Sequence, residues 1–256
     1  MKYRIKSGKI VYELFEPKGK NLKKGVIVIS GLPNQPRNED FGDTLAEQGF
    51  YVLQPRYIGS WESDGKFSLT NCIKTVLEAE RLFLQGKAKE CWGNKKIEWS
   101  IEKVYILSSS FGSTIVLSAL PKLKSERIIC LAPLTDLKKH NSDKNLKEED
   151  LTHLGGFLKR GFANAFRGLD EKDWKEFIKG DSEANPMNYI KEIRNKKILL
   201  LHGDADDVVN ISRTEDYYNK IKKDNEVEMK RFPGIGHGKE LKKGSFKEVV
   251  KWIRSN

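Results

Sequence analysis

The stretch VYILSSSFGSTIVLSAL, residues Val104–Leu120, places three consecutive serines between two apolar segments. Residues 104–108 are rich in β-branched and aromatic side chains, which favours a buried strand. Residues 110–120 are apolar over a longer run without strict alternation, which favours a helix. The serines therefore stand at a predicted strand-to-helix turn, where a side chain projects beyond the edge of a sheet.

Only one of the three serines has small neighbours on both sides. A nucleophile on a tight strand-to-helix turn needs small residues two positions before and two positions after it. Ser109 has bulky apolar residues at both places, whereas Ser110 is flanked by Ser108 and Gly112. Ser110 is therefore the predicted nucleophile, with a serine in place of the first glycine of the G-x-S-x-G pattern. A polar loop is the alternative interpretation of the triplet taken alone.

Strand-like and helix-like segments alternate on both sides of this turn. The predicted strands are residues 9–17 with 3–6 pairing beside them, 25–30, 50–55, 104–108, 127–133, 197–203 and 227–234. The predicted helices are residues 39–49, 68–85, 110–120, 212–223 and 245–255. This alternation is typical of an α/β fold with a mostly parallel central sheet flanked by helices.

The alternation stops between residues 136 and 189. This segment holds charged helical patterns at 148–166 and 171–179 and no convincing strand. It is too long for an ordinary loop between two strands. We interpret it as a helical cap insertion that shapes the substrate pocket. No repeat or low-complexity linker divides the chain, so residues 1–256 are predicted to form a single domain.

The composition argues against several classes of protein. A net charge of +11 raises the hypothesis of nucleic-acid binding. The lysines are spread along the chain among acidic residues, without an arginine cluster, which favours a solvated surface and predicts no nucleic-acid partner. Cys72, Cys91 and Cys130 lie far apart and lack the spacing of metal ligands. We therefore expect neither a metal nor another cofactor.

The hydropathy pattern indicates in which cellular compartment the protein is expected. No apolar run approaches the ~20 residues that cross a bilayer. The opening stretch MKYRIKSGKIVYELF lacks the apolar core of a signal peptide. The expectation is a cytoplasmic protein with no membrane partner. The sequence carries no indication of its oligomeric state.

A nucleophilic serine needs a base, and the base needs a carboxylate to orient it. His140 and His153 lie in the charged insertion, and His202 ends a predicted buried strand, which favours a structural role. His237 stands in the glycine-rich loop FPGIGHGKE after the last predicted strand. Glycines let that loop direct an imidazole toward the strand ends, so His237 is the predicted base.

Three aspartates are candidates for the carboxylate. Asp204, Asp206 and Asp207 all follow the predicted strand 197–203. Each of them gives the chain order serine, aspartate, histidine, which is the order of α/β-hydrolases. Position after a strand does not distinguish the three.

Together, the stretches SSSFG, LLLHGDADDVV and GIGH resemble the α/β-hydrolase superfamily over nearly the whole chain. PRYIGSWESDGKFS and ANPMNYIKEIRNKKILLLHGDADD are similar to the catalytic domain of prolyl-oligopeptidase-type hydrolases and their small esterase relatives. The family pattern H-G-x-x-D-x-x-V falls on His202, Gly203, Asp206 and Val209, which selects Asp206. The resemblance therefore implies an α/β-hydrolase fold and a catalytic triad of Ser110, Asp206 and His237.

The resemblance also implies an oxyanion hole made of two backbone N–H groups. One belongs to Phe111, the residue after the nucleophile. The other falls on Leu32, in the loop after the strand at 25–30, because Pro33 has no N–H to donate. The family has a His-Gly pair before this position, whereas this chain has Ser30-Gly31.

The implied activity is that of a serine hydrolase of the carboxylesterase type, which cleaves a small-molecule ester through an acyl-enzyme. A prolyl-oligopeptidase-type peptidase is one alternative. Against it, no segment is long or strand-rich enough for the β-propeller of those enzymes, and the acidic run Glu148–Asp150 is more typical of a solvated helix face. A second alternative is a non-catalytic binding protein that keeps the pocket but lacks triad geometry.

Overall fold

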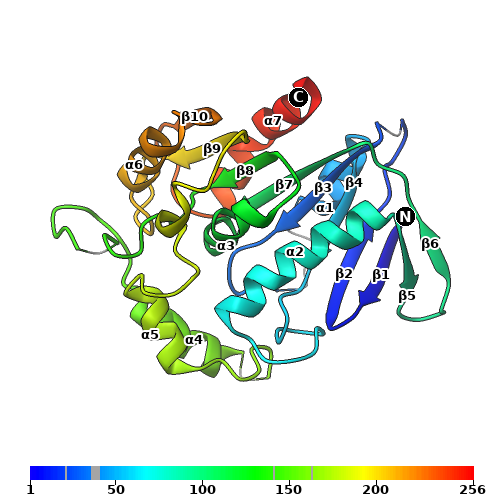
Figure 1. Ribbon diagram of the computed structural model, residues 1–256, viewed down its shortest axis with the longest axis horizontal. Coiled ribbons are helices and arrows are strands. Elements are labelled where there is room, and N and C mark those ends of the chain that lie inside the picture. Colours follow the sequence, from blue (N-terminus) through cyan, green and yellow to red (C-terminus); the bar gives the residue numbers. More distant parts are fainter. Residues whose placement is uncertain (21, 36–40, 141, 163) are drawn as a thin grey trace.

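Ten strands of the described residues form one continuous sheet with helices on both faces (Figure 1). The computed structural model describes residues 1–20, 22–35, 41–140, 142–162 and 164–256. The strands are β1 (Lys2–Ser7), β2 (Ile10–Phe15), β3 (Lys24–Ile29), β4 (Tyr51–Pro55), β5 (Lys87–Glu90), β6 (Lys96–Glu98), β7 (Lys103–Ser109), β8 (Arg127–Leu131), β9 (Lys197–Gly203) and β10 (Glu226–Phe232). The helices are α1 (Gly42–Glu47), α2 (Leu69–Gln85), α3 (Phe111–Ala119), α4 (Thr152–Gly161), α5 (Glu171–Ile178), α6 (Ile211–Ile221) and α7 (Lys239–Ser255), with 3-10 turns at Leu120–Lys122 and Pro186–Tyr189.

The strand order is β10-β9-β8-β7-β3-β4-β2-β1-β5-β6. The first six of these strands run parallel to one another. The other four join antiparallel, beginning where β2 pairs with β4. The central strands are buried on both faces, which is why they read as continuous apolar runs in the sequence. The predicted mostly parallel central sheet flanked by helices is confirmed.

Each face of the sheet has its own apolar core. Helices α2, α3 and α6 pack into one core, and α1 and α7 pack into the other. Figure 1 shows α2 and α3 in front of the sheet. The side chain of Ser68 caps the first turn of α2, and Gly86 ends that helix with a φ of 74°. Within the described ranges, no helix combines the length and the apolarity that a bilayer crossing demands.

The segment between β8 and β9 contains α4 and α5, which lie together at the lower left of Figure 1. Trp174 of α5 is buried and stacks on Phe111 with ring centroids 6.4 Å apart. Helix α4 approaches closely because Gly155 has no side chain, and a Cβ there would lie 2.7 Å from the Trp174 ring. Glu148 accepts two hydrogen bonds, of 2.9 and 2.8 Å, from the guanidinium of Arg213 on α6. The contacts of Trp174 with α3 and of Glu148 with α6 attach the segment to helices that cover the sheet.

Two features differ from the sequence-based expectations. The hairpin of β5 and β6 was not predicted, because its strands are short and charged and are held by pairing with β1. Helix α7 begins at Lys239 rather than at Ser245. The sequence pattern missed its first turns because they are charged and bury little apart from Leu241. The helix predicted at 39–49 corresponds to α1, and residues 39 and 40 lie outside the described ranges.

Candidate active site

Ser110 occupies the sharp turn between β7 and α3. Its backbone has a φ of 50° and a ψ of −127°, a conformation that side-chain-bearing residues rarely adopt. The Ser110 N–H donates to the carbonyl oxygen of Leu131 on β8 at 2.8 Å, which helps to hold the turn. A strained turn of this kind presents the hydroxyl beyond the sheet edge.

The two residues that flank Ser110 at a distance of two positions have different reasons to be small. A Cβ on Gly112 would lie 2.4 Å from the carbonyl oxygen of Ile29, so only glycine fits there. Ser108 is buried, and its hydroxyl donates to the carbonyl oxygen of Ile129 at 3.1 Å. It also accepts a hydrogen bond from the Ser113 hydroxyl at 3.1 Å. Serine is therefore accommodated at the first position because its hydroxyl is fully hydrogen-bonded.

His237 lies between Ser110 and Asp206. Its Nε2 is 2.9 Å from Ser110 Oγ, and its Nδ1 is 2.6 Å from Asp206 Oδ2. A carboxylate can only accept, so Nδ1–H donates to Asp206 and the unprotonated Nε2 accepts from the serine hydroxyl. The loop that carries His237 packs directly on Gly203, where a Cβ would lie 2.0 Å from the carbonyl oxygen of Ile235. The glycine at the end of β9 thus permits this placement of the imidazole.

Asp206 is buried, and both of its carboxylate oxygens have donors. Oδ1 accepts from the backbone N–H groups of Val208 at 3.0 Å and Val209 at 2.9 Å. Oδ2 lies 2.6 Å from His237 Nδ1 and 3.2 Å from His202 Nε2. Burial alone raises the pKa of the Asp206 carboxyl, but the hydrogen bonds from His202, His237 and the Val209 N–H hold that pKa below its usual range. The carboxylate is therefore ionised at neutral pH.

His202 contacts Asp206 directly, a contact that the structural role expected from the sequence did not specify. It is fully buried at the end of β9. Its Nδ1 is 2.8 Å from Thr214 Oγ1, and its Nε2 lies 2.9 Å from the Val209 carbonyl oxygen. Because carbonyl and carboxylate oxygens only accept, Nε2 carries a proton that it shares between Val209 and Asp206. The place of His202 four residues before Asp206 in the H-G-x-x-D pattern was the available signal.

The other sequence candidates lie apart from the side chains of Ser110, His237 and Asp206. His140 Nε2 bonds the carbonyl oxygen of Glu149 at 2.8 Å, and His153 is exposed on α4. Asp204 accepts from a backbone N–H of the loop after β10 at 2.7 Å, and Asp207 is exposed. Of the candidate bases and acids, the structure therefore brings His237 and Asp206 to Ser110.

The two predicted oxyanion donors lie on segments that border Ser110. A Cβ on Gly31 would lie 3.7 Å from Ser110 Oγ, so the loop after β3 passes directly beside the hydroxyl, and Leu32 is the next residue. Phe111 is the first residue of α3, where backbone N–H groups have no partner inside the helix. Among the described residues, no acceptor faces the N–H of Leu32 or Phe111.

A cavity of about 410 Å³ opens beside Ser110. Its described lining comes from residues 30–35 after β3, from Ser109 and Ser110, from Leu131 and Ala132 at the end of β8, and from five residues of the stretch 237–242. No residue of the insertion at 136–189 belongs to that described lining. The expectation that the insertion shapes the pocket therefore finds no support at this cavity.

Comparisons with solved structures identify the same fold in several hydrolases. A monoacylglycerol lipase from Paleococcus ferrophilus is 17% identical, with a TM-score of 0.62 over 97% of this chain and 99% of that one. The Est2 esterase of Thermogutta terrifontis with propionate bound is 15% identical, with a TM-score of 0.64 over 99% and 94%. An acylaminoacyl peptidase from Pyrococcus horikoshii is 14% identical, with a TM-score of 0.64 over 99% of this chain but 40% of that one.

These likenesses establish the α/β-hydrolase fold that the sequence motifs implied. A search among curated protein sequences found no match. The model of the prolyl oligopeptidase family matches residues 43–256, which include β7, β9 and the loop that carries His237. The resemblance inferred from the motifs is thereby confirmed, and this chain belongs to the prolyl oligopeptidase family.

Proposed function

We propose that this chain is a serine carboxylesterase that cleaves small carboxylic esters through an acyl-enzyme on Ser110. One observation carries the proposal, namely the continuous hydrogen-bond path from the Ser110 hydroxyl through His237 to Asp206, with steps of 2.9 and 2.6 Å. A binding protein that had lost catalysis would have no need to keep this path. The membership of a hydrolase family supports the same conclusion.

The first half of the proposed reaction forms the acyl-enzyme. Ser110 Oγ attacks the carbonyl carbon of the ester while its proton moves to His237 Nε2. The ionised Asp206 stabilises the imidazolium that results. The negative charge on the carbonyl oxygen is stabilised by the N–H groups of Leu32 and Phe111. Collapse of the tetrahedral intermediate breaks the ester C–O bond, and the proton on His237 passes to the departing alcohol.

The second half releases the acid. A water molecule gives a proton to His237 Nε2 as its oxygen attacks the acyl carbon. A second tetrahedral intermediate forms and is stabilised by the same two N–H groups. It collapses to a carboxylic acid and returns the proton to Ser110 Oγ. The net reaction consumes one ester and one water and restores the enzyme.

Two observations favour an ester over a peptide substrate. The described lining of the cavity contains no aspartate or glutamate, so no carboxylate there could hold the free amino group of a peptide. The Thermogutta terrifontis esterase, which shares this fold, also has a short carboxylate, propionate, bound. The propionate in that esterase supports a short acyl group for this chain too.

A panel of chromogenic substrates tests this proposal. We expect p-nitrophenyl acetate and butyrate to be cleaved readily and long-chain esters less well, because a cavity of about 410 Å³ is small for a lipid chain. Gly-Pro and aminoacyl p-nitroanilides should react far more slowly, since an amide is the harder bond to break. The measurement is kcat/KM for each substrate under identical conditions.

The panel also distinguishes the alternatives. A clear preference for the anilides would assign the chain to the peptidases. Absence of both activities, together with failure to be labelled by a fluorophosphonate probe, would indicate a binding protein instead.

The pH dependence of the esterase follows from the protonation states in the site. Because the pKa of Asp206 is held below its usual range, that carboxylate stays ionised between about pH 5 and pH 8. Its contribution to stability is present above the unfolded-state pKa of about 3.9 and is lost as the pH falls through the lower folded value. Catalysis also requires the imidazole of His237 in its neutral form, because a protonated ring cannot accept the serine proton.

We therefore expect kcat/KM for a neutral ester to rise between about pH 6 and pH 7, where imidazoles lose their proton, and then to level off. The measurement is a profile of kcat/KM against pH at constant ionic strength. A profile that stayed flat from about pH 5 to pH 8 would argue against an imidazole base.

A further inference from the structure

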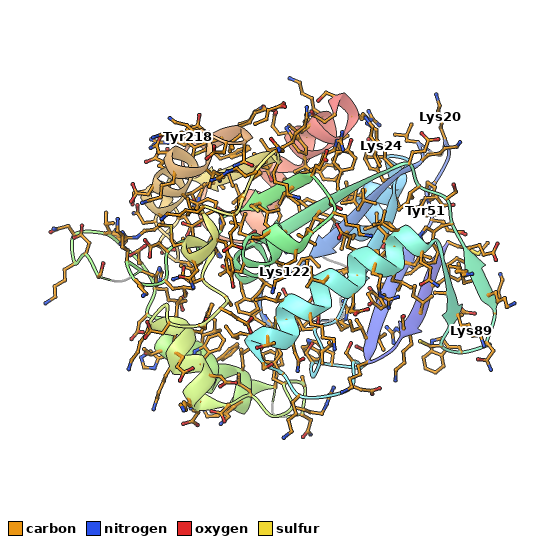
Figure 2. All side chains as sticks on the ribbon, in the orientation of Figure 1. Lys20, Lys24, Tyr51, Lys89, Lys122 and Tyr218 are labelled. Carbon is orange, nitrogen blue, oxygen red and sulfur yellow. The ribbon has the colours of Figure 1, made fainter. Side chains whose placement is uncertain are left out.

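The hairpin of β5 and β6 forms one end of the sheet, remote in the strand order from β7 and β9, which carry the candidate active site. Figure 1 shows it at the right-hand end of the molecule. Figure 2 labels Lys89 on this hairpin. The proposed esterase mechanism uses no residue of it.

Three lysines stand in one row across neighbouring strands. Lys6 of β1 is directly opposite Lys89 of β5, and Lys89 is directly opposite Lys96 of β6. Like charges at directly opposed positions destabilise a sheet. Lys6 has a partner in Asp64 at 2.8 Å, but among the residues that the structure describes no carboxylate forms an ion pair with Lys89 or Lys96. Lys89 and Lys96 therefore carry positive charge that no ion pair of the described residues compensates.

A hollow of about 370 Å³ adjoins this row, between the end of α2 and strands β1, β5 and β6. Four lysines belong to its described lining, namely Lys6, Lys87, Lys89 and Lys96. Glu98 is the single carboxylate among the described residues of the lining. The charge of this surface is complementary to an anionic partner.

An exposed tryptophan lies at the turn of the same hairpin. Trp92 is 80% exposed, whereas Trp99, Trp174 and Trp252 are each less than a tenth exposed. Tryptophan has a large apolar ring with a polar N–H, a combination that favours the boundary between hydrocarbon and water. Trp92 and the lysine row together make the hairpin amphipathic.

Protection of the sheet edge accounts for only part of this arrangement. Lysines on an edge strand prevent pairing with the sheet of another molecule, which would explain Lys96 on β6. The same argument does not require Lys6 and Lys89, which lie on strands that already have partners on both sides. It also gives no reason to expose a large aromatic ring.

We propose that the hairpin of β5 and β6 binds the surface of an anionic phospholipid bilayer. The lysines attract the negative headgroups, and Trp92 enters the headgroup region. A bilayer accounts for these residues better than a nucleic acid does. A single-stranded nucleic acid is held by several stacking aromatics, and this turn offers one.

Vesicle co-sedimentation tests the proposal directly. We expect the protein to bind vesicles of phosphatidylcholine with about a third phosphatidylserine, and to bind pure phosphatidylcholine weakly, because anionic lipid supplies the attraction. Binding should decrease as salt is added. Replacing Lys89 and Lys96 together by glutamine should lower the partition coefficient by about 25-fold, since each lysine near such a surface contributes about fivefold.

Matched variants separate this surface from general charge effects. The pair Lys220→Gln and Lys223→Gln removes the same charge from exposed positions at the other end of the molecule, on or just after α6, and should bind as the wild type does. Trp92→Phe should abolish the blue shift in tryptophan emission that vesicles cause, because the other four tryptophans lie outside the hairpin. Thermal unfolding of each variant checks that the fold is intact.

Three outcomes would overturn the proposal. The first is equal binding to both kinds of vesicle or to neither. The second is an equal loss for the Lys89/Lys96 pair and the α6 pair. The third is tighter binding to a single-stranded oligonucleotide than to anionic vesicles at the same salt, which would assign the hairpin to nucleic acid. None of these readouts depends on esterase activity, so the proposal stands or falls independently of the proposed function.

Discussion

The Ser110→Ala variant is expected to lose esterase activity by about 10⁶-fold, the loss that follows removal of the nucleophile in a serine hydrolase. Alanine retains the Cβ, so the strain of the turn at φ 50° is unchanged and the fold should persist. Labelling by a fluorophosphonate probe should disappear at the same time. The measurements are kcat with p-nitrophenyl acetate, probe labelling, and the unfolding transition of both proteins.

Ser109→Ala is the matched control for this variant. Ser109 is the neighbouring serine, and its side chain makes no hydrogen bond in the described structure. Its replacement should leave kcat/KM within about tenfold of the wild type. If Ser109→Ala were as damaging as Ser110→Ala, the assignment of the nucleophile would be wrong.

Asp206→Asn is expected to lower kcat by about 10⁴-fold. Oδ1 of Asp206 accepts from two backbone N–H groups, so the amide oxygen of asparagine should take that position. The amide NH₂ then faces His237 Nδ1, which must accept a hydrogen bond instead of donating one. The proton of the neutral imidazole consequently moves to Nε2. A protonated Nε2 can no longer accept the proton of Ser110. The measurement is kcat with a neutral ester.

The neighbouring aspartates provide controls of equal charge. Asp207→Asn changes an exposed side chain, and Asp204→Asn changes one that accepts a hydrogen bond from a backbone N–H of the loop after β10. Both variants should keep most of their activity. A large loss in Asp207→Asn with little loss in Asp206→Asn would mean that the carboxylate assignment is displaced by one residue.

The sequence was sufficient to predict the parallel part of the sheet. Its central strands are buried on both faces and therefore appear as short continuous apolar runs, such as residues 197–203, which coincide with β9. The turn at Ser110 was predictable for a steric reason, because the approach of Ile29 to Gly112 excludes any side chain there. Chain order and motif spacing then selected Asp206 and His237.

The contacts that complete the site were not predictable in the same way. His202 was assigned a structural role because it ends a buried strand, and its spacing of four residues from Asp206 did not by itself predict that its Nε2 lies 3.2 Å from the carboxylate. That distance depends on how the loop after β9 returns over the strand. The predicted oxyanion donors were selected by family resemblance, and the structure places Gly31, the residue before Leu32, beside Ser110.

The hairpin of β5 and β6 shows where local patterns fail. Lys87–Glu90 has no β-branched or aromatic residue, and Lys96–Glu98 buries one side chain, Ile97. Neither segment has the propensity of a strand. Strand β5 forms because it pairs with the free edge of β1, and β6 forms because it pairs with β5. Pairing of this kind is a tertiary effect that a local pattern does not contain. The expectation of no membrane partner rested on hydropathy alone, whereas the proposed lipid-binding surface rests on the charges and the exposed tryptophan of this hairpin.

The position of the cavity has a consequence for how the specificity of this protein could be altered. Because its described walls come from residues 30–35 and 237–242 together with the ends of β7 and β8, libraries that change the accepted ester should be directed at those segments. The α4–α5 segment could be exchanged for that of another hydrolase with less risk to turnover, provided that Trp174 is retained as the support of Phe111. Selectivity and surface properties could thus be engineered separately in one chain.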